Sequence, residues 1–172
     1  MGIVLKNPVN STYHNEKLWH KKGLQDIKVR EFIPHVITPE EAKVLVSFIE
    51  NADNPEIPPI VDKIKAAIEE VINPNWGLPS YTRIEKHKKS HDWHVDTGSS
   101  NHMKWCDYGC SVLLTDTEDS GFLEYRDGTK FLPEEHFCGL AIHSSDVEHR
   151  TEQPGNRTVF LAFVVGGVKA AQ

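Results

Sequence analysis

The segment from Thr158 to Val165 reads Thr-Val-Phe-Leu-Ala-Phe-Val-Val and is apolar at nearly every position. A strand that buries one face alternates apolar and polar side chains, whereas a continuous apolar run is typical of a strand covered on both faces. We expect one face of this segment to meet an opposing sheet and the other to meet a helix. The segment therefore predicts the centre of a layered, mainly β fold.

Shorter strand-like runs precede this segment. They cover 110–115, 121–126 and 139–143, and each is bounded by Asp, Ser, Gly or Pro, as strands between turns are. Asp127-Gly128 follows the second run directly and is typical of a hairpin turn. Together with the run 157–165, these segments predict a sheet structure for the second half of the chain.

Helical spacing dominates the region before residue 75. Thr38-Pro39-Glu40-Glu41 has the pattern of a capping box, which predicts a helix from about Pro39 to Ala52. A second amphipathic helix is expected between Pro58-Pro59 and Asn73-Pro74. Its apolar positions are Ile57, Ile60, Val61, Ile64, Ile68, Val71 and Ile72.

These elements predict an α+β, mainly β fold, in which two helices pack on one side of a β-sandwich or barrel. A chain of 172 residues with 38% apolar content suits one domain, 1–172, with helical support over about 30–75 and a β core over about 76–166. Residues 1–25 show little periodicity and receive no assignment.

Composition narrows the possible partners and location. The chain has 19 Lys and Arg against 25 Asp and Glu, a net charge of −6, which argues against a nucleic-acid partner because phosphate binding needs a basic surface. No long apolar run and no secretory leader is present, so we expect a soluble cytoplasmic protein without a membrane partner. The oligomeric state is left open. The chain has three cysteines, Cys106, Cys110 and Cys138, and this odd, small number predicts free thiols rather than disulfides.

The triplet His94-Val95-Asp96 is a candidate metal-binding motif, because residues i and i+2 of a strand point to the same face. His149 follows the 139–143 strand and a polar turn, and it is the expected third ligand. Two histidines and one carboxylate with open coordination positions suit non-haem iron(II) rather than a closed structural zinc site. Taken alone, the triplet is a weak signal and is more often an ordinary surface pair.

Arg157 strengthens the metal interpretation. It lies eight residues after His149, beyond a Gln-Pro-Gly-Asn turn that would make the two strands antiparallel neighbours. We expect Arg157 to point into the same interior as the metal ligands, where its guanidinium suits bidentate binding of a carboxylate. The alternative is that Arg157 pairs with a surface acid such as Glu152.

Motif order and spacing resemble a known family. The segments 93–97, 120–125 and 155–159, together with His149, are similar to those of the iron(II)- and 2-oxoglutarate-dependent oxygenases, in particular the prolyl-hydroxylase-like branch. The stretch from Phe32 to Ala52 resembles the opening strand and helix of that family. The resemblance implies a double-stranded β-helix, or jelly roll. It also implies that iron(II) is bound by His94, Asp96 and His149, and the 2-oxoglutarate distal carboxylate by Arg157.

The resemblance also implies an activity. It implies a dioxygenase that uses iron(II) and 2-oxoglutarate, and it allows ascorbate as a further cofactor. The expected reaction is hydroxylation of a C–H bond, in the favoured case on a prolyl residue of a peptide or protein, with release of succinate and carbon dioxide. Two alternatives stay open: an oxygenase that acts on a free amino acid or small molecule, and a non-enzymatic cupin-like metal-binding or structural module.

The chain departs from the family pattern in several places. Only Gly121 remains of a frequent double glycine, and Ser120 precedes it. The segment 84–91 is basic and free of glycine, which leaves the second 2-oxoglutarate contact without an assigned residue. Tyr81 is a candidate for that hydrogen bond. A family tyrosine position falls at Leu114, which cannot donate.

Other polar and aromatic residues are assigned structural roles. We interpret His143 as a satisfied core histidine and exclude His91 and His94 as a pair, since i and i+3 share a face only on a helix. The aromatic residues Trp93, Trp105 and Tyr108 are read as core and rim side chains rather than as a peptide-binding wall. Substrate recognition is expected from the loop 97–107 and the segment before Tyr81.

Overall fold

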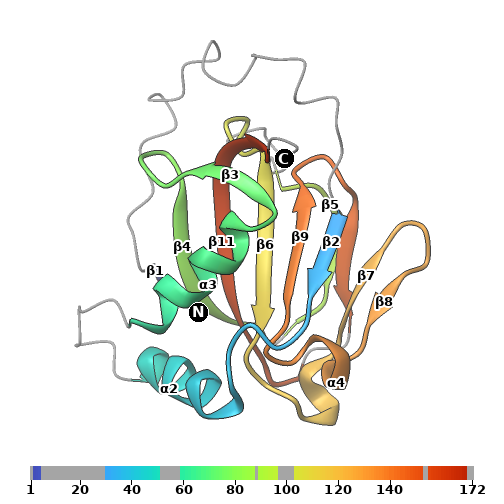
Figure 1. Ribbon diagram of the computed structural model, residues 1–172. Coiled ribbons are helices and arrows are strands. Elements are labelled where there is room, and N and C mark those ends of the chain that lie inside the picture. The colour runs from blue at the N-terminus through green and yellow to red at the C-terminus, as the bar shows by residue number, and fades with distance from the viewer. Residues whose placement is uncertain are drawn as a thin grey trace.

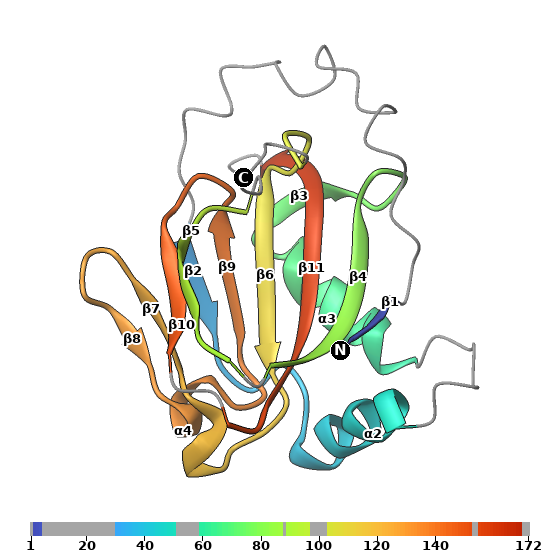
Figure 2. The same ribbon diagram turned by 180° about the vertical axis from the view of Figure 1, so that it is seen from behind.

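The computed structural model describes residues 2–4, 30–50, 59–87, 89–96, 103–152 and 155–169. Within these ranges, two antiparallel sheets face each other and helices lie on the outer face of the larger one (Figures 1 and 2). This is the expected α+β, mainly β jelly-roll arrangement. The recognition loop expected at 97–107 lies outside the described residues over 97–102.

The larger sheet places its most apolar strand near the middle. Among the described strands its order is β1-β4-β11-β6-β9-β2, and β3 also pairs with β11. The strands are β1 (Gly2–Val4), β2 (Arg30–Ile33), β3 (Ile72–Asn75), β4 (Tyr81–His87), β6 (Tyr108–Leu113), β9 (Leu140–Ser144) and β11 (Arg157–Val168).

The smaller sheet covers the inner face of the larger one. Its described strands run in the order β5-β10-β7-β8, with bounds His91–His94, His149–Glu152, Phe122–Tyr125 and Lys130–Phe131 respectively. The turn Asp127-Gly128 joins β7 to β8, as expected, and Gly128 has a φ of 93°, which suits glycine. A short helix η3 (Glu118–Ser120) precedes β7, and α4 (Pro133–His136) follows β8.

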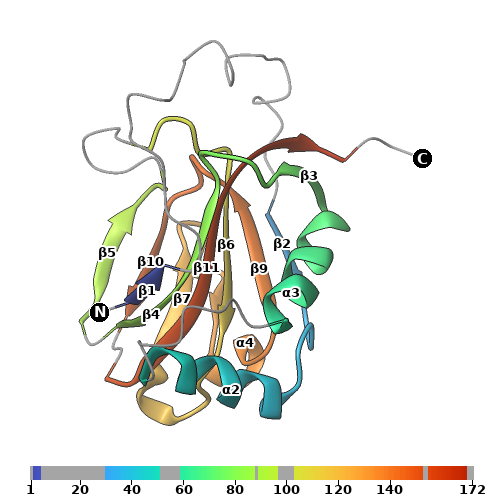
Figure 3. The same cartoon turned by 90° about the vertical axis from the view of Figure 1, so that its left-hand side faces the viewer.

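The two expected helices are α2 (Pro39–Glu50) and α3 (Ile60–Glu69). The capping box opens α2: Glu41 N–H donates to Thr38 Oγ1 at 3.1 Å, and Thr38 N–H donates to Glu41 Oε1 at 2.9 Å. Both helices lie on the side of the larger sheet that faces away from β5 and β10 (Figure 3). Their apolar side chains form one core with the outer face of the sheet, which includes Leu45, Ile64, Ile68, Val112, Phe160 and Val164.

The second helix is shorter than its apolar spacing predicts. It ends at Glu69, and Ile72 to Asn75, which include the expected helix stop, form strand β3. The prediction fails at this end because Ile72 is buried in the same core whether it continues the helix or starts a strand. Pairing of β3 with Val165–Val168 of β11 supplies backbone partners, and an edge strand tolerates Pro74.

Strand β11 is covered on both faces, as its composition predicts. Phe160, Ala162 and Val164 belong to the core under the helices, whereas Arg157, Val159 and Leu161 line a cavity between the sheets. All three cysteines are buried free thiols, as expected. No helix among the described residues is long and apolar enough to cross a membrane.

Candidate metal centre

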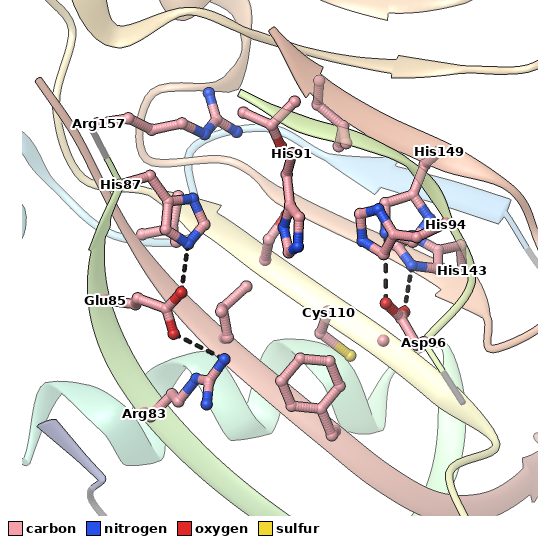
Figure 4. Close-up of a pocket in the computed structure, with 17 residues that line it drawn as sticks. Arg83, Glu85, His87, His91, His94, Asp96, Cys110, His143, His149 and Arg157 are labelled. Atoms are coloured by element: carbon pink, nitrogen blue, oxygen red, sulfur yellow. Dashed lines mark hydrogen bonds and ion pairs between the residues drawn. The ribbon is translucent and has the colours of Figure 1, made fainter. Parts of the chain in front are cut away.

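A cavity lies between the two sheets. The larger sheet contributes residues from β4, β6, β9 and β11, and the smaller sheet contributes residues from β5, β7 and β10. His94, Asp96, His149 and Arg157 all line it (Figure 4). The jelly roll therefore brings the four residues singled out in the sequence into one enclosed space.

His94, Asp96 and His149 form a compact set of metal donors. One candidate ligand atom from each lies within 4.8 Å of the others. His94 ends β5, and His149 lies directly opposite it at the start of β10. Asp96 lies just beyond β5 rather than on it, and its N–H donates to Ser145 O at 2.9 Å, which fixes this turn against the end of β9. A donor set of two imidazoles and one carboxylate fits iron(II).

Both histidines present the same ring nitrogen to this centre. His94 Nδ1 lies 2.7 Å from Asp92 O, and His149 Nδ1 lies 2.9 Å from Val147 O, so each Nδ1–H donates to a backbone carbonyl. The lone pair of each Nε2 is then left for a metal ion, and the ring orientation is fixed. Burial lowers the pKa of His94 to about 4, which keeps its ring neutral and able to ligate near pH 7.

Asp96 is held from the opposite sheet by His143. Asp96 Oδ2 lies 2.6 Å from His143 Nε2, and Tyr125 O–H donates to His143 Nδ1 at 3.0 Å. The interpretation of His143 as a satisfied core residue is therefore incomplete. It is buried and fully hydrogen-bonded, but it also lines the cavity and contacts a candidate metal ligand. Nothing in the sequence near His143 indicated this contact.

Gly109 on β6 makes the approach of Asp96 possible. A Cβ atom at this position would overlap the Asp96 carboxylate and would lie 2.9 Å from His143 Nε2. The position therefore excludes any side chain while Asp96 points at the centre. The glycine is needed for close approach rather than for its backbone dihedral angles.

We expect Gly109→Ala to weaken metal binding by about 10- to 100-fold, because the added methyl group displaces Asp96 from its position. The measurement is titration with Co(II), an air-stable probe of the same donor set. Gly77→Ala, at an exposed glycine remote from the cavity, serves as the control. Unchanged Co(II) affinity in Gly109→Ala would show that Asp96 does not take part in binding.

Arg157 occupies the cavity wall without an acidic partner. Only 2% of the residue is exposed, and Nη1 donates to Ser120 O at 3.1 Å, while Nε has no partner. Glu152, the alternative partner, instead forms an ion pair with Arg150 at 3.4 Å. Burial lowers the pKa of Arg157 to about 10, so the guanidinium stays charged near pH 7. A buried cation without a counter-ion among the described residues suits an anionic ligand.

His136 on α4 is a further titratable group behind Arg157. It is fully buried, its Nε2 lies 3.3 Å from Ser111 O, and burial together with the charge of Arg157 lowers its pKa to about 3. In the unfolded chain, by contrast, the histidine pKa is near 6.5. Between these two values the unfolded state binds a proton that the native state does not, so acid destabilises the native state.

We expect His136→Leu to make the apoprotein less sensitive to acid. The free energy of unfolding of the wild type falls with decreasing pH below 6.5, and His136 contributes about 1.4 kcal/mol per pH unit to that slope. Urea unfolding of both proteins at pH 4 to 7, with chelator present, measures the difference in slope. Equal slopes for the two proteins would mean that His136 titrates normally in the native state.

His91 corrects one inference from strand periodicity. His94 lies opposite His149 and His91 lies opposite Thr151, so four residues of β5 span three of β10. This β-bulge turns residues i and i+3 to the same side. The rings of His91 and His94 therefore stack, with centroids 4.4 Å apart. His91 lines the cavity but lies outside the three-residue donor set. The premise that His91 and His94 cannot share a face was wrong because it assumed a regular strand, although the pair by itself does not form the donor set.

The candidate for a second 2-oxoglutarate contact points elsewhere. Tyr81 packs its ring against Trp105 and Phe163, and its hydroxyl lies 3.8 Å from Met103 Sδ. It is not among the residues that line the cavity. Leu114, at the family tyrosine position, is buried in the core under the helices.

The aromatic residues take the structural roles that were expected. Trp105 and Tyr108 are buried in apolar clusters, and Trp93 lies beneath the guanidinium groups of Arg126 and Arg150, at 4.2 and 4.7 Å from its ring centroid. None of the three aromatic residues lines the cavity.

A charged row on β4 forms the wall that sequence reasoning missed. Arg83, Glu85 and His87 alternate along the strand and face the cavity (Figure 4). Glu85 forms an ion pair with Arg83, with 2.6 Å between Nη2 and Oε2, and accepts a hydrogen bond from His87 Nε2 at Oε1, also at 2.6 Å. The hydrogen bond from His87 lowers the pKa of Glu85. Period-2 spacing in 83–87 was the available signal, but the sequence-based expectation rested only on the basic, glycine-free composition of the segment 84–91.

Comparison with solved structures identifies the fold. A prolyl-4-hydroxylase from Pseudomonas putida matches with a TM-score of 0.58 at 13% identity, over 84% of this chain and 98% of that one. A prolyl 4-hydroxylase from Phytophthora capsici matches with a TM-score of 0.58 at 15% identity, over 94% and 68%. The non-heme alpha-ketoglutarate-dependent carbocyclase SnoK from nogalamycin biosynthesis matches with a TM-score of 0.52 at 11% identity, over 93% and 87%.

No protein-family model matches the chain, and no curated protein matches it in sequence. At identities of 11 to 15%, the structural matches establish the fold alone. The chain has the jelly-roll fold of the iron(II)- and 2-oxoglutarate-dependent oxygenases, in agreement with the resemblance of its motifs. What the site does is a separate question, which its own residues must answer.

Proposed function

We propose that this protein is an iron(II)- and 2-oxoglutarate-dependent dioxygenase that hydroxylates a C–H bond. One observation carries the proposal: a buried arginine that has no acidic partner in the described part of the chain shares a cavity with a two-histidine, one-carboxylate donor set. A module that only binds a metal has no need of a buried cation facing its ligands. A 2-oxoglutarate molecule, by contrast, has one carboxylate for Arg157 and a second carboxylate and keto group for the metal.

Each residue of the cavity has a distinct role in the proposed reaction. His94, Asp96 and His149 would hold iron(II) through one atom each, which leaves coordination positions for other ligands. The iron and 2-oxoglutarate would supply oxygen activation, with succinate and carbon dioxide as co-products. Arg157 would bind and orient the distal carboxylate, and its backbone partner Ser120 O would hold the guanidinium in place. Leu123, Val159 and Leu161 would exclude water from that end of the cavity.

Succinate release tests this proposal. Purified protein with iron(II), ascorbate and 2-oxoglutarate should release succinate in air and none under nitrogen, even without a primary substrate, because many sites of this kind turn over slowly when uncoupled. A 2-oxoglutarate binding titration under nitrogen covers the case in which uncoupled turnover is absent. Absence of both oxygen-dependent turnover and metal-dependent binding would refute the dioxygenase proposal.

For the substrate, we propose a prolyl residue of a peptide or protein. Two of the matched structures are prolyl 4-hydroxylases, which supports this choice. The charged row Arg83, Glu85 and His87 gives the cavity wall hydrogen-bonding groups that suit peptide amides. The match to SnoK, an enzyme of nogalamycin biosynthesis, favours a small molecule as the second candidate.

A peptide array read by mass spectrometry distinguishes these substrates. Incubation with iron(II) and 2-oxoglutarate should add the mass of one oxygen atom to proline-containing peptides but leave matched alanine-containing peptides unchanged. The same assay with free proline tests the small-molecule alternative. Hydroxylation of free proline and of no peptide would overturn the choice of a peptide substrate.

A further inference from the structure

We propose that Tyr125 and His143 form a positioning pair that fixes Asp96 as a one-oxygen metal ligand. The inference rests on the metal site of the proposed function and deepens it. It assigns a role to two buried polar residues on β7 and β9, neither of which is itself in the donor set. The argument comes from the two oxygens of Asp96, the two nitrogens of His143 and the space around them.

The two carboxylate oxygens of Asp96 face different partners. Oδ2 lies 2.6 Å from His143 Nε2, whereas Oδ1 lies 3.3 Å from His149 Nε2, on the side of the donor cluster (Figure 4). A hydrogen bond to Oδ2 occupies one of the lone pairs of that oxygen and disfavours bidentate metal binding. The geometry therefore directs Oδ1 alone toward the metal, which keeps more coordination positions open for other ligands.

Tyr125 determines which nitrogen of His143 carries the proton. Its hydroxyl lies 3.0 Å from Nδ1, and donation of that O–H places the lone pair of neutral His143 on Nδ1 and its proton on Nε2. Nε2–H then donates to the Asp96 carboxylate. This single arrangement pairs both nitrogens of His143 and Asp96 Oδ2, and such pairing lets a buried network specify one geometry.

The pair is rigidly supported. Tyr125 is 1% exposed and His143 is 4% exposed, and their rings meet nearly edge to face at 77°. The guanidinium of Arg30 lies 4.9 Å from the Tyr125 ring centroid and covers it. Gly109 lies beside both Asp96 and His143 and leaves no room for another donor at that side. The positions of the three groups are therefore set by packing of both sheets.

The test compares the Co(II) affinity of variants that keep or remove the hydrogen bond from residue 143 to Asp96 while a side chain still fills that position. His143→Leu removes the donor, whereas His143→Gln keeps an N–H of similar reach. We expect His143→Leu to bind Co(II) about 10- to 100-fold more weakly, and His143→Gln to recover most of that loss. Tyr125→Phe should lose roughly 2- to 10-fold, as one hydrogen bond is removed. Tyr108→Phe, which removes a buried hydroxyl outside the cavity, should match wild type.

Two further readouts distinguish positioning from a merely structural role. Adding Tyr125→Phe to His143→Leu should cause no further loss, because the tyrosine acts through the histidine. The visible absorption band of bound Co(II) should change in His143→Leu and return toward wild type in His143→Gln, since it reports the coordination of the metal. Circular dichroism confirms that each variant is folded.

The outcomes separate this inference from the proposed function. If wild type binds no Co(II), the metal site itself fails. If wild type binds Co(II) and His143→Leu binds it equally well, only the positioning role fails. Equal loss in His143→Leu and His143→Gln, or additive losses with Tyr125→Phe, would likewise overturn the role, because they would show an effect without the hydrogen bond.

Discussion

Replacing Asp96 with alanine is expected to abolish oxygen-dependent turnover of 2-oxoglutarate, to below ~0.1% of wild type. The physical reason is that Asp96 supplies the anionic ligand of the donor set, and the metal contributes several kcal/mol to the reaction. Stabilisation of the fold by added metal should disappear together with the activity, because that stabilisation depends on binding to the native state. Succinate release and thermal unfolding with and without Co(II) measure the two effects.

The Asp96→Ala protein should still fold, with a modest loss in its free energy of unfolding. Removal of the carboxylate leaves His143 Nε2–H without its acceptor, a cost of about 1–3 kcal/mol for a buried donor. Asp116→Ala, at an exposed aspartate after β6, is the matched control and should keep both metal stabilisation and turnover. Metal stabilisation that persists in Asp96→Ala would place the metal elsewhere in the protein.

Arg157→Leu is expected to raise the KM for 2-oxoglutarate by roughly 30- to 5,000-fold. Loss of one partner from a buried, hydrogen-bonded charge pair costs about 2–5 kcal/mol, which corresponds to that range. The stability of the apoprotein should stay the same or increase, because the substitution removes a buried cation without a counter-ion. This combination of weaker ligand binding and undiminished stability distinguishes a ligand-binding arginine from a structural one.

Urea unfolding of the apoprotein and the dependence of turnover on 2-oxoglutarate concentration measure the two parts of this prediction. Arg150→Leu provides the control, since Arg150 pairs with Glu124 and Glu152 outside the cavity. It should leave the KM near that of wild type. A marked loss of apoprotein stability in Arg157→Leu with an unchanged KM would assign Arg157 to the fold rather than to the cosubstrate.

The site could be inferred from sequence to the extent that strand periodicity holds. His94 and Asp96 are two residues apart, and His149 and Arg157 flank one turn, so both pairs were expected to lie close together. The expected antiparallel pairing of the last two strands was wrong, because β10 and β11 lie in opposite sheets and the turn passes from one sheet to the other. The expectation that His91 and His94 lie on different faces failed because a β-bulge breaks the regularity of the strand, and no local residue pattern predicts the bulge. The end of the second helix was predicted too late in the chain, because Ile72 is buried in the same core whether it is helical or extended.

The sequence by itself determined the layers, the two helix starts and the central strand, because each depends on contacts between residues close in the chain or on a simple period. It also predicted the candidate metal donor set, from the spacing of His94 and Asp96 and the order of the motifs that follow them. Only the tertiary structure decided the surroundings of that donor set. His143 reaches Asp96 across 47 residues, Gly109 leaves room for the carboxylate, and β4 supplies a charged wall. Such contacts arise when two sheets pack face to face, and residues far apart in the chain leave no periodic signal of the pairing.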